Sequence, residues 1–401
     1  MKFAHMADCH IGAWRDPKLK DLSMEAFIKA VNISVEKKVD FILISGDLFN
    51  TSLPSIDHLK LTTKKLKELK ELNIPVYIIP GSHDQSPSGK TMLDVLEEAG
   101  LLINVFRGIV QDERLVLKFT PDKKTGALIT GLLGRRGTLD RKYYEHLAKA
   151  SLEKVPGTKI FMFHTAVKEL MPKDLVDKIE SAPIDSFPKG FEYYAGGHIH
   201  IVRHENFKDY KNVVYPGPLM PASFSELEKL RKGSFFIYNH GKVEMVPIEL
   251  VKCYPVKVDA EGNNPEEVKE IIDQFTKMQD FSNTIVLIRV FGKLKSGRPS
   301  DINFKDVFKK LYDQKAFFVM KSTTKLTSEE FDEIKISSSS VEDVESEVIK
   351  EHLGQINNSF KDESEVTKKL MTSMSSEKHE GEKVYEYEER IKKEIEKILE
   401  I

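Results

Sequence analysis

The sequence has little cysteine, no long apolar run and almost no net charge, and each of these absences narrows the class of protein. Its 401 residues include two cysteines, Cys9 and Cys253, too few for a disulfide framework or a cysteine zinc site. No segment approaches the roughly 18 consecutive apolar residues of a membrane span, and the N-terminus enters a strand pattern without a basic region or cleavage site. We therefore expect a cytoplasmic protein in a reducing compartment.

The formal net charge is −2, with 40% hydrophobic and 31% charged residues, which is typical of a soluble globular protein. Charge alone neither indicates nor excludes nucleic acid, so any phosphate-binding surface must be a local patch. A chain of 401 residues is too long for one compact core and predicts two or three domains.

Short apolar runs alternate with helical patterns in the first half of the chain, which predicts an α/β domain with buried strands. Apolar residues at helical spacing predict helices over 22–35 and 56–72, and residues 233–246 predict a closing hairpin. The expected strands are 3–7, 39–45, 75–80, 159–163 and 193–195.

The pattern restarts near Val251 and predicts a second, smaller α+β domain with the order strand, helix, strand, helix, strand. Ser337 to Ser340 predicts a polar linker. Apolar residues at helical spacing over 341–360 and 391–399 predict two amphipathic helices around a weak Ser/Lys/Glu stretch. We place the domain boundaries at 1–248, 249–335 and 336–401.

Each of the five expected strands in the first half is followed by residues that commonly bind metals. A lone histidine after a strand is usually a cap or surface residue, but core packing does not explain five such occurrences in this order. The carboxyl ends of strands in open α/β sheets border the functional crevice, so one site could gather all five groups. The residues are Asp8 and His10, Asp47, Ser82 with His83 and Asp84, His164, and His198 with His200.

The spacing of these residues also favours a shared site, because residues two apart in extended chain point to the same side. Asp8 would then face the same way as His10, and Cys9 would point away and pack in the core. Mixed imidazole and carboxylate ligands suit manganese, iron or zinc better than magnesium or calcium. Four histidines and two aspartates are enough donors for two ions.

The series D-x-H, G-D, G-S-H-D, H and G-H-x-H resembles the calcineurin-type metallophosphoesterases. More narrowly, the blocks HMADCHIG, GDLFN, YYAGGHIH and YPGP resemble the SbcD-type, or meiotic-recombination-eleven, family of DNA repair nucleases. The resemblance covers about residues 1–325. It implies a metallophosphoesterase β-sandwich flanked by helices, a small α+β DNA-capping domain and a C-terminal helical tail.

The resemblance also implies a site for two Mn²⁺ ions. His83 would be the catalytic residue that stabilises the transition state or protonates the leaving oxygen, and Asp84 would fix the tautomer of a histidine. The first ion would be held by Asp8, His10, Asp47 and His200, and Asp47 would bridge to a second ion held by Ser82, His164 and His198.

Two positions depart from the family pattern. Ser82 stands where the family has asparagine, and its shorter hydroxyl would hold the second ion more loosely or through water. Asn50 stands where several members have a histidine linked to exonuclease action, which puts exonucleolytic positioning by that residue in doubt.

The expected function is therefore a manganese-dependent single-strand endonuclease and 3′ to 5′ double-strand exonuclease in double-strand-break repair, associated with the chromosome. The resemblance implies a homodimer through helices at 56–72 and 91–99. It also implies docking of residues 341–401, mobile in the isolated protein, on an ABC-type ATPase of the SbcC or Rad-fifty type, although these residues could instead pack on their own chain. The alternatives are a phosphoesterase acting on nucleotides or phosphoproteins, and a metal-impaired scaffold that holds DNA ends.

Overall fold

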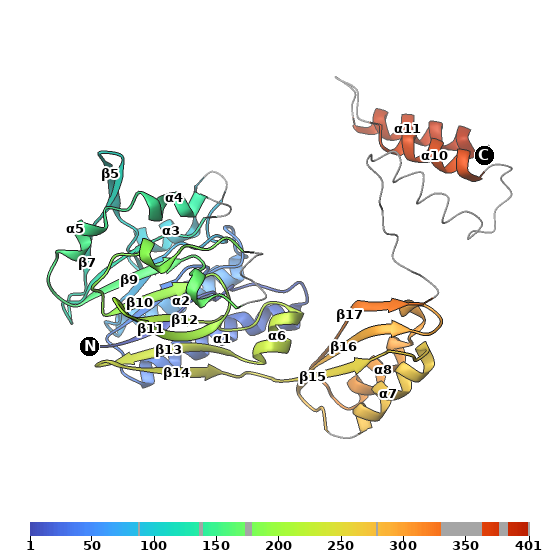
Figure 1. Cartoon of the computed structure of the whole chain (residues 1–401), viewed down its shortest axis with the longest axis horizontal. Helices are drawn as coiled ribbons and strands as arrows, with labels where there is room; N and C mark the ends of the chain where they lie inside the picture. The colour runs from blue at the N-terminus through green and yellow to red at the C-terminus, as the bar shows by residue number, and fades with distance from the viewer. Residues whose placement is uncertain are drawn as a thin grey trace.

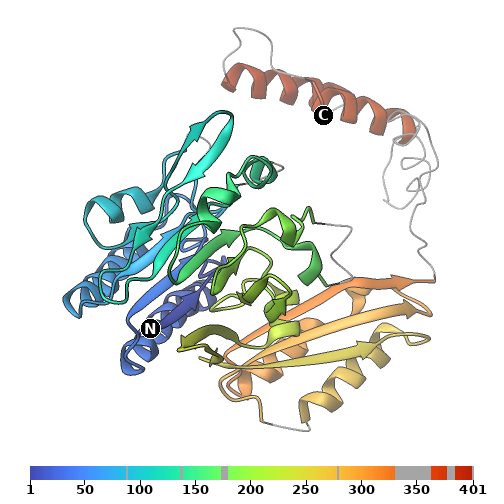
Figure 2. The same cartoon turned by 60° about the vertical axis from the view of Figure 1, so that its left-hand side comes forward.

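The structure is a computed structural model, and it describes residues 1–86, 89–135, 139–172, 179–277, 280–329, 363–376 and 384–399. Two six-stranded sheets lie face to face in the larger body, and a three-stranded sheet follows in a smaller one (Figure 1). The turned view of Figure 2 shows the three-stranded sheet beside the larger body. The expected fold, a β-sandwich flanked by helices with a smaller α+β part, is confirmed.

The first sheet has the strand order β14-β13-β1-β2-β3-β4. Strands β1 to β4 are parallel, and β13 pairs antiparallel with β1. The strands are β1 (Lys2–Met6), β2 (Phe41–Ser45), β3 (Val76–Ile79), β4 (Ile103–Asn104), β13 (Gly233–Asn239) and β14 (Lys242–Ile248). The helices between the parallel strands are α1 (Pro17–Glu36), α2 (Ile56–Glu71) and α3 (Met92–Glu98).

The second sheet has the strand order β11-β12-β10-β9-β8-β7. Its strands are β7 (Thr120–Pro121), β8 (Leu128–Leu132), β9 (Lys159–His164), β10 (Tyr193–Gly197), β11 (Val202–Phe207) and β12 (Tyr210–Pro216). Around it lie the hairpin β5 (Gly108–Gln111) and β6 (Arg114–Leu117), the helices α4 (Leu139–Glu145) and α5 (Lys149–Glu153), and the short 3₁₀ helices η1 (Lys168–Leu170) and η2 (Ile184–Ser186). Helix α6 (Phe224–Leu230) packs instead on the core of the first sheet, through Phe224 and Leu227.

The central strands are apolar on both faces because both faces are covered. In β2, Phe41 and Leu43 point into the core between the two sheets, whereas Ile42 and Ile44 pack toward the helices. Strand β9 divides its residues in the same way between the core of the sandwich and the outer face of the second sheet. This two-sided burial explains why the strands appear in the sequence as continuous apolar runs rather than alternating ones.

The smaller sheet has the order β15-β16-β17, and its neighbouring strands are parallel. It packs with its helices around a core of its own, centred on residues such as Val258, Ile272 and Ile288. The elements are β15 (Lys252–Asp259), α7 (Pro265–Lys277), β16 (Thr284–Leu294), the 3₁₀ helix η3 (Pro299–Asp301), α8 (Phe304–Asp313) and β17 (Phe318–Ser328). All five expected elements are present here in the expected order.

Two helices are described in the tail, α10 (Glu363–Met374) and α11 (Val384–Leu399). They contact each other, with Ser373 Oγ donating to Glu394 at 2.7 Å. Helix α11 carries the expected apolar stripe, but α10 lies where we expected only a weak polar stretch, so that expectation was wrong. The expected linker at 337–340 and the helix over 341–360 lie outside the described residues. Among the helices that the structure describes, none is long and apolar enough to cross a membrane.

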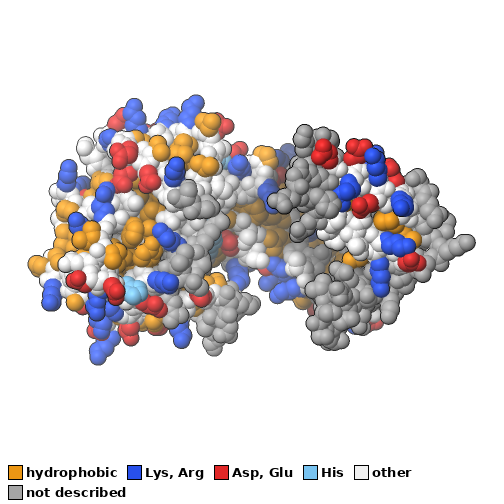
Figure 3. Space-filling model, turned by 90° about the horizontal axis from the view of Figure 1, so that it is seen from above, with side chains coloured by type: hydrophobic (Ala, Val, Ile, Leu, Met, Phe, Trp, Pro, Cys, Tyr) orange, Lys and Arg blue, Asp and Glu red, His pale blue; other side chains and the backbone are white. Residues whose placement is uncertain are grey.

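The surface carries both signs of charge. Figure 3 shows basic and acidic side chains interspersed over the face that it presents, with hydrophobic side chains gathered on the larger body. This mixture agrees with the formal net charge of −2.

Phe3 provides a test of the sandwich core. It is fully buried, stacks on Phe41 and Tyr238 within the first sheet, and meets Tyr193 of the second sheet edge-on. We expect Phe3→Ala to lower the free energy of unfolding by about 3–5 kcal/mol, because the smaller side chain leaves a cavity between the two sheets. Urea denaturation measures this free energy. Met245→Ala, at a position 45% exposed on β14, is the control and should change it by about 0.5 kcal/mol or less. Equal losses in the two variants would contradict this account of the core.

Candidate metal centre

The carboxyl ends of β1, β2, β3, β9 and β10 place their polar residues together, as the sequence predicts. The backbone makes sharp turns at this edge, and five candidate ligands have a positive φ that non-glycine residues rarely adopt. These φ values are 49° at Asp8, 41° at His10, 52° at Asp47, 102° at His198 and 41° at His200. Asp8 and His10 do present donors to one group, as expected, but they converge through turns and not through extended chain, so that reason was wrong. Cys9 is fully buried in the core, as expected.

Three groups of side chains in the described residues have donor atoms within 4.8 Å of one another. Asp47 belongs to two of these groups, and so do Asp8 and His10. The groups are Asp8 with His10 and His200, His10 with Asp47 and His83, and Asp8 with Asp47 and His164. Of the seven predicted ligands and the predicted catalytic residue His83, six are thus brought together at one edge of the sandwich.

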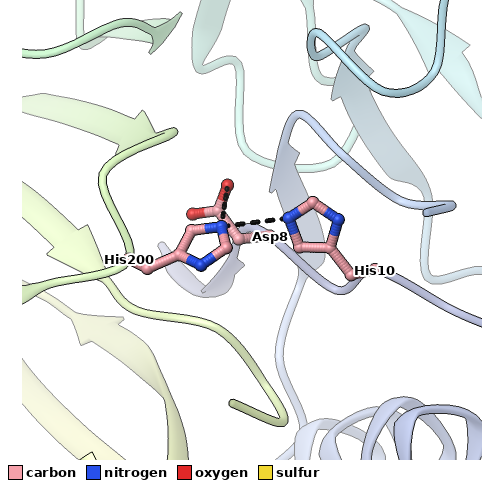
Figure 4. Close-up of side chains that lie close together, drawn as sticks. All are labelled: Asp8, His10 and His200. Carbon is pink, nitrogen blue, oxygen red and sulfur yellow. Dashed lines mark hydrogen bonds and ion pairs between the residues drawn. The ribbon is translucent and has the colours of Figure 1, made fainter. Parts of the chain in front are cut away.

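The first group is drawn in Figure 4, where His200 points toward both Asp8 and His10. His200 Nε2 lies 3.8 Å from Asp8 Oδ1 and 3.0 Å from His10 Nε2. Two imidazole lone pairs at such a distance repel each other unless a proton or a cation lies with them. The donor set therefore suits a divalent ion.

His164 is equally suited to a metal ion in the third group, with Asp8 and Asp47. Its Nδ1 donates to the carbonyl of Ser45 at 2.8 Å, which leaves Nε2 3.2 Å from Asp47 Oδ2. Nε2 is buried and makes no well-formed hydrogen bond, so its interaction is the ion pair with Asp47. Gly46 leaves room for the ring, since a Cβ there would lie 2.1 Å from His164 Nδ1. A buried imidazole nitrogen that faces a carboxylate is suited to bind a metal ion in exchange for its proton.

His83 is held against Asp47 by its backbone. Its N–H donates to Asp47 Oδ1 at 2.7 Å, and its Nδ1 donates to the carbonyl of Asn50 at 2.8 Å. The ring meets His10 edge-on, with centroids 4.8 Å apart. His83 is thus oriented by a backbone carbonyl, with Nε2 as its remaining nitrogen for chemistry.

Asp84 does not orient a histidine, contrary to our expectation. Its carboxylate accepts from the backbone N–H of Leu48, Phe49 and Gly81, at 3.3, 3.1 and 2.9 Å. Asp84 therefore ties the loop after β2 to the loop after β3. Asp84 does not reach a histidine because backbone N–H groups of both loops surround its buried carboxylate.

His198 and Ser82 lie beside these groups and belong to none of them. The ring of His198 meets that of His164 at 5.1 Å between centroids, and its backbone N–H donates to both oxygens of Asp8 at 2.9 and 3.1 Å. Ser82 is buried, 8% exposed, next to His83. Their roles as ligands of a second ion stay predictions.

The sequence analysis did not identify Glu226 and His5, two residues that lie against the site. Glu226 Oε2 lies 3.2 Å from His200 Nδ1, and in the sequence Ser223 and Glu226 have only the spacing of a helix capping box. His5 is fully buried between Tyr193 Oη and Ser45 Oγ, each 3.0 Å away. A polar residue within an apolar strand was the only signal for it.

Burial and opposing charges set the protonation of the histidines. Burial alone would lower the pKa of His164, but Asp47 and Asp8 outweigh it and raise that pKa to about 10. Burial likewise opposes the effect of Asp8 and Glu226 on His200, whose pKa rises to about 9. Burial lowers the pKa of His10 to about 3. Burial and the nearby charge of His164 lower the pKa of His198 to about 4. Before an ion binds, these shifts favour protonated His164 and His200 at neutral pH and neutral His10 and His198.

A sequence profile of the calcineurin-like phosphoesterase family matches residues 1–202, half of the chain, and the chain belongs to this family. Several similar curated proteins share the name DNA double-strand break repair protein Mre11. These relatives confirm the resemblance to the SbcD-type, meiotic-recombination-eleven family.

The Archaeoglobus fulgidus relative is 31% identical over 287 residues, which are 65% of this chain and 62% of that protein. The Methanococcus maripaludis relative is 27% identical over 299 residues, 70% and 74% of the two chains. The Saccharolobus solfataricus relative is 30% identical over 254 residues, 59% and 60%. The chain thus matches less than two thirds of the length of the first and third relatives.

The protonation of the site predicts proton release on metal binding. Manganese binds neutral imidazole, so binding at pH 7 should release about two protons, one each from His164 and His200. Affinity should rise from pH 6 to pH 8, and the release should decline as the pH passes through 9 to 10. Calorimetry in buffers of different ionisation enthalpy measures this number. A binding enthalpy that is independent of the buffer would contradict it.

Proposed function

We propose that this protein is a manganese-dependent DNA nuclease of double-strand-break repair. The observation that supports it best is the position of Asp47, whose Oδ2 lies 3.7 Å from His10 Nε2 and 3.2 Å from His164 Nε2. The same oxygen of Asp47 thus faces His10 on one side of the site and His164 on the other, as a carboxylate that bridges two ions would. The names of the relatives support DNA as the substrate.

In this proposal Asp8, His10, Asp47 and His200 hold one Mn²⁺, and Asp47, Ser82, His164 and His198 hold the other. When bound, two such ions clamp a phosphate and lower the pKa of an attacking water. The chain supplies the positions of these ligands. Ser45 and Glu226 orient His164 and His200, and Asp84 joins the loops that carry Asp47 and Ser82.

His83 is the proposed catalytic residue. With Nδ1 donating to the Asn50 carbonyl, the Nε2 atom is left to meet a phosphate oxygen or to protonate the leaving 3′ oxygen. The hydrogen bond from the backbone N–H of His83 to Asp47 holds the His83 ring next to the proposed bridging carboxylate. We propose both single-strand endonuclease and 3′ to 5′ exonuclease action, although Asn50 offers no imidazole at its position.

The remaining parts have proposed roles in binding. We propose that residues 1–248 form the nuclease domain, 249–335 a DNA-capping domain and 336–401 the segment that docks on an ABC-type ATPase. Helices α2 and α3 expose apolar residues, with Ile56 83% and Val95 58% exposed, and this face is the proposed homodimer contact. Sedimentation of the full chain at micromolar concentration measures that association.

One alternative is a metal-impaired scaffold that holds DNA ends, which only Ser82 favours. A nuclease assay on plasmid and hairpin DNA with Mn²⁺ separates it from the proposed function. A protein that hydrolyses nucleotides or phosphoproteins but not DNA would instead be a general phosphoesterase.

Asp47→Ala tests the bridging role. Cleavage of plasmid DNA with Mn²⁺ should fall by more than roughly 100-fold, because both ions lose a ligand, and losing even an outer-shell partner costs 10- to 100-fold. Asp209→Ala, which removes a carboxylate of an exposed ion pair with Lys189, is the matched control and should cleave normally. Thermal unfolding shows whether each variant is folded. A folded Asp47→Ala protein with full activity would contradict the two-ion site.

Ser82→Asn tests the second ion. An amide oxygen reaches further than the serine hydroxyl and is a better neutral ligand, so manganese should bind more tightly and cleavage should be faster. Calorimetry gives the affinity, and initial rates on single-stranded DNA give the activity. Equal affinities in the two proteins would mean that the structure already compensates for the serine.

A further inference from the structure

Helix α6 lies between the metal site and the smaller sheet. Figure 1 shows it at the edge of the larger body that faces β15, and the helix contacts that strand. Its side chains reach in two directions. Glu226 contacts His200, whereas Phe224 and Glu228 contact Arg289 of β16.

On the metal side, Glu226 fixes His200. Glu226 Oε2 accepts from His200 Nδ1 at 3.2 Å and from the backbone N–H of Ala222 at 2.9 Å. With Nδ1 engaged, Nε2 is the nitrogen that faces Asp8 and His10 (Figure 4). A carboxylate in this position holds the ring orientation and raises the basicity of the ligand. Glu226 is therefore a positioning residue, because it acts through His200.

On the opposite side, Arg289 holds the helix. Its Nε donates to both oxygens of Glu228, at 2.8 and 2.9 Å, and its guanidinium lies 4.8 Å from the centre of the Phe224 ring. Arg289 Nη1 also donates to Ser322 Oγ of β17 at 3.2 Å. Both partners of the ion pair are only 13% exposed, so water screens the contact weakly. One arginine thus joins α6 to two strands of the smaller sheet.

The two contacts are mechanically linked because α6 has only seven residues. Glu226 and Glu228 are two positions apart on it, so a shift of the smaller sheet that moves Glu228 also moves Glu226. We propose that α6 couples the position of the smaller sheet to His200, so that Arg289 and Glu226 together set the metal affinity of the Asp8, His10 and His200 group. This inference rests on the proposed metal site.

Coupling of this kind is reciprocal. If the smaller sheet tunes the metal group through α6, then an ion bound there must in turn stabilise the contact between α6 and β16. Amide hydrogen exchange of residues 284–294 gives a readout that does not depend on cleavage. Protection of this strand should increase when Mn²⁺ is added.

The decisive experiment is calorimetric titration of the full chain with MnCl₂. Glu226→Ala should weaken binding by roughly 10- to 100-fold, as loss of such a supporting carboxylate does. Glu226→Gln should recover much of this loss, because its amide oxygen still accepts from His200 Nδ1. Arg289→Gln should weaken binding by roughly 2- to 30-fold. Glu228→Gln breaks the same ion pair from α6 and should have a similar effect, even if Arg289→Gln disturbs the smaller sheet.

A double variant and a matched control test the route of the coupling. Arg289→Gln should add little further loss in a Glu226→Ala background, because the two changes act on one path. Lys295→Gln removes the same charge just after β16, at the exposed pair of Lys295 with Glu267, and it should bind Mn²⁺ like the wild type.

The outcomes separate this inference from the proposed function. If the wild type binds no manganese, the proposed function fails and the coupling fails with it. If the wild type binds and both Arg289→Gln and Glu228→Gln bind equally well, the coupling alone is wrong. It is also wrong if the two losses add in full, or if Lys295→Gln weakens binding as much as Arg289→Gln.

Discussion

The buried carboxylate of Asp47 is the constraint on which the site depends. It is 2% exposed, and an isolated charge at that depth would be costly unless positive or hydrogen-bonding groups compensate it. Burial opposes its ionisation, but His164 and the backbone N–H of His83 lower its pKa. The structure therefore supports a charged Asp47 only because three loops deliver their polar groups to the same point. A divalent ion would complete the same compensation.

The packing of the sandwich makes this delivery possible. Both faces of β2 and β9 are covered, so the strands leave no polar surface except at their ends. The chain turns sharply there, and positive φ values occur at the candidate ligands rather than in the core. Such strain persists only where the surroundings hold the backbone, and at Asp47 the neighbouring residues Leu48 and Phe49 donate their backbone N–H groups to Asp84.

Behind the candidate ligands, the structure assigns the supporting roles to atoms that no motif shows. The carbonyls of Ser45 and Asn50 orient His164 and His83, and every residue type has a carbonyl. The backbone N–H of Glu226 donates to the N-cap Ser223 at the start of α6, and the carboxylate of Glu226 meets His200. Glu228 of the same short helix pairs with Arg289 of the smaller sheet. The sequence pattern of helix capping therefore does not reveal the two long-range contacts of α6, with His200 and with Arg289.

The sequence by itself determined the order of the strands along the chain, the core residues of β1, β2 and β3, and the identity of the residues at their ends. These are local properties, because apolar periodicity and turn residues act over a few positions. Only the tertiary structure decided that Asp8 and His10 converge through turns, that Asp84 binds backbone rather than histidine, and that α10 forms in a polar stretch. It also decided the contact of Glu226 with His200, because the facing partner of a side chain depends on packing between distant segments and not on neighbouring residues.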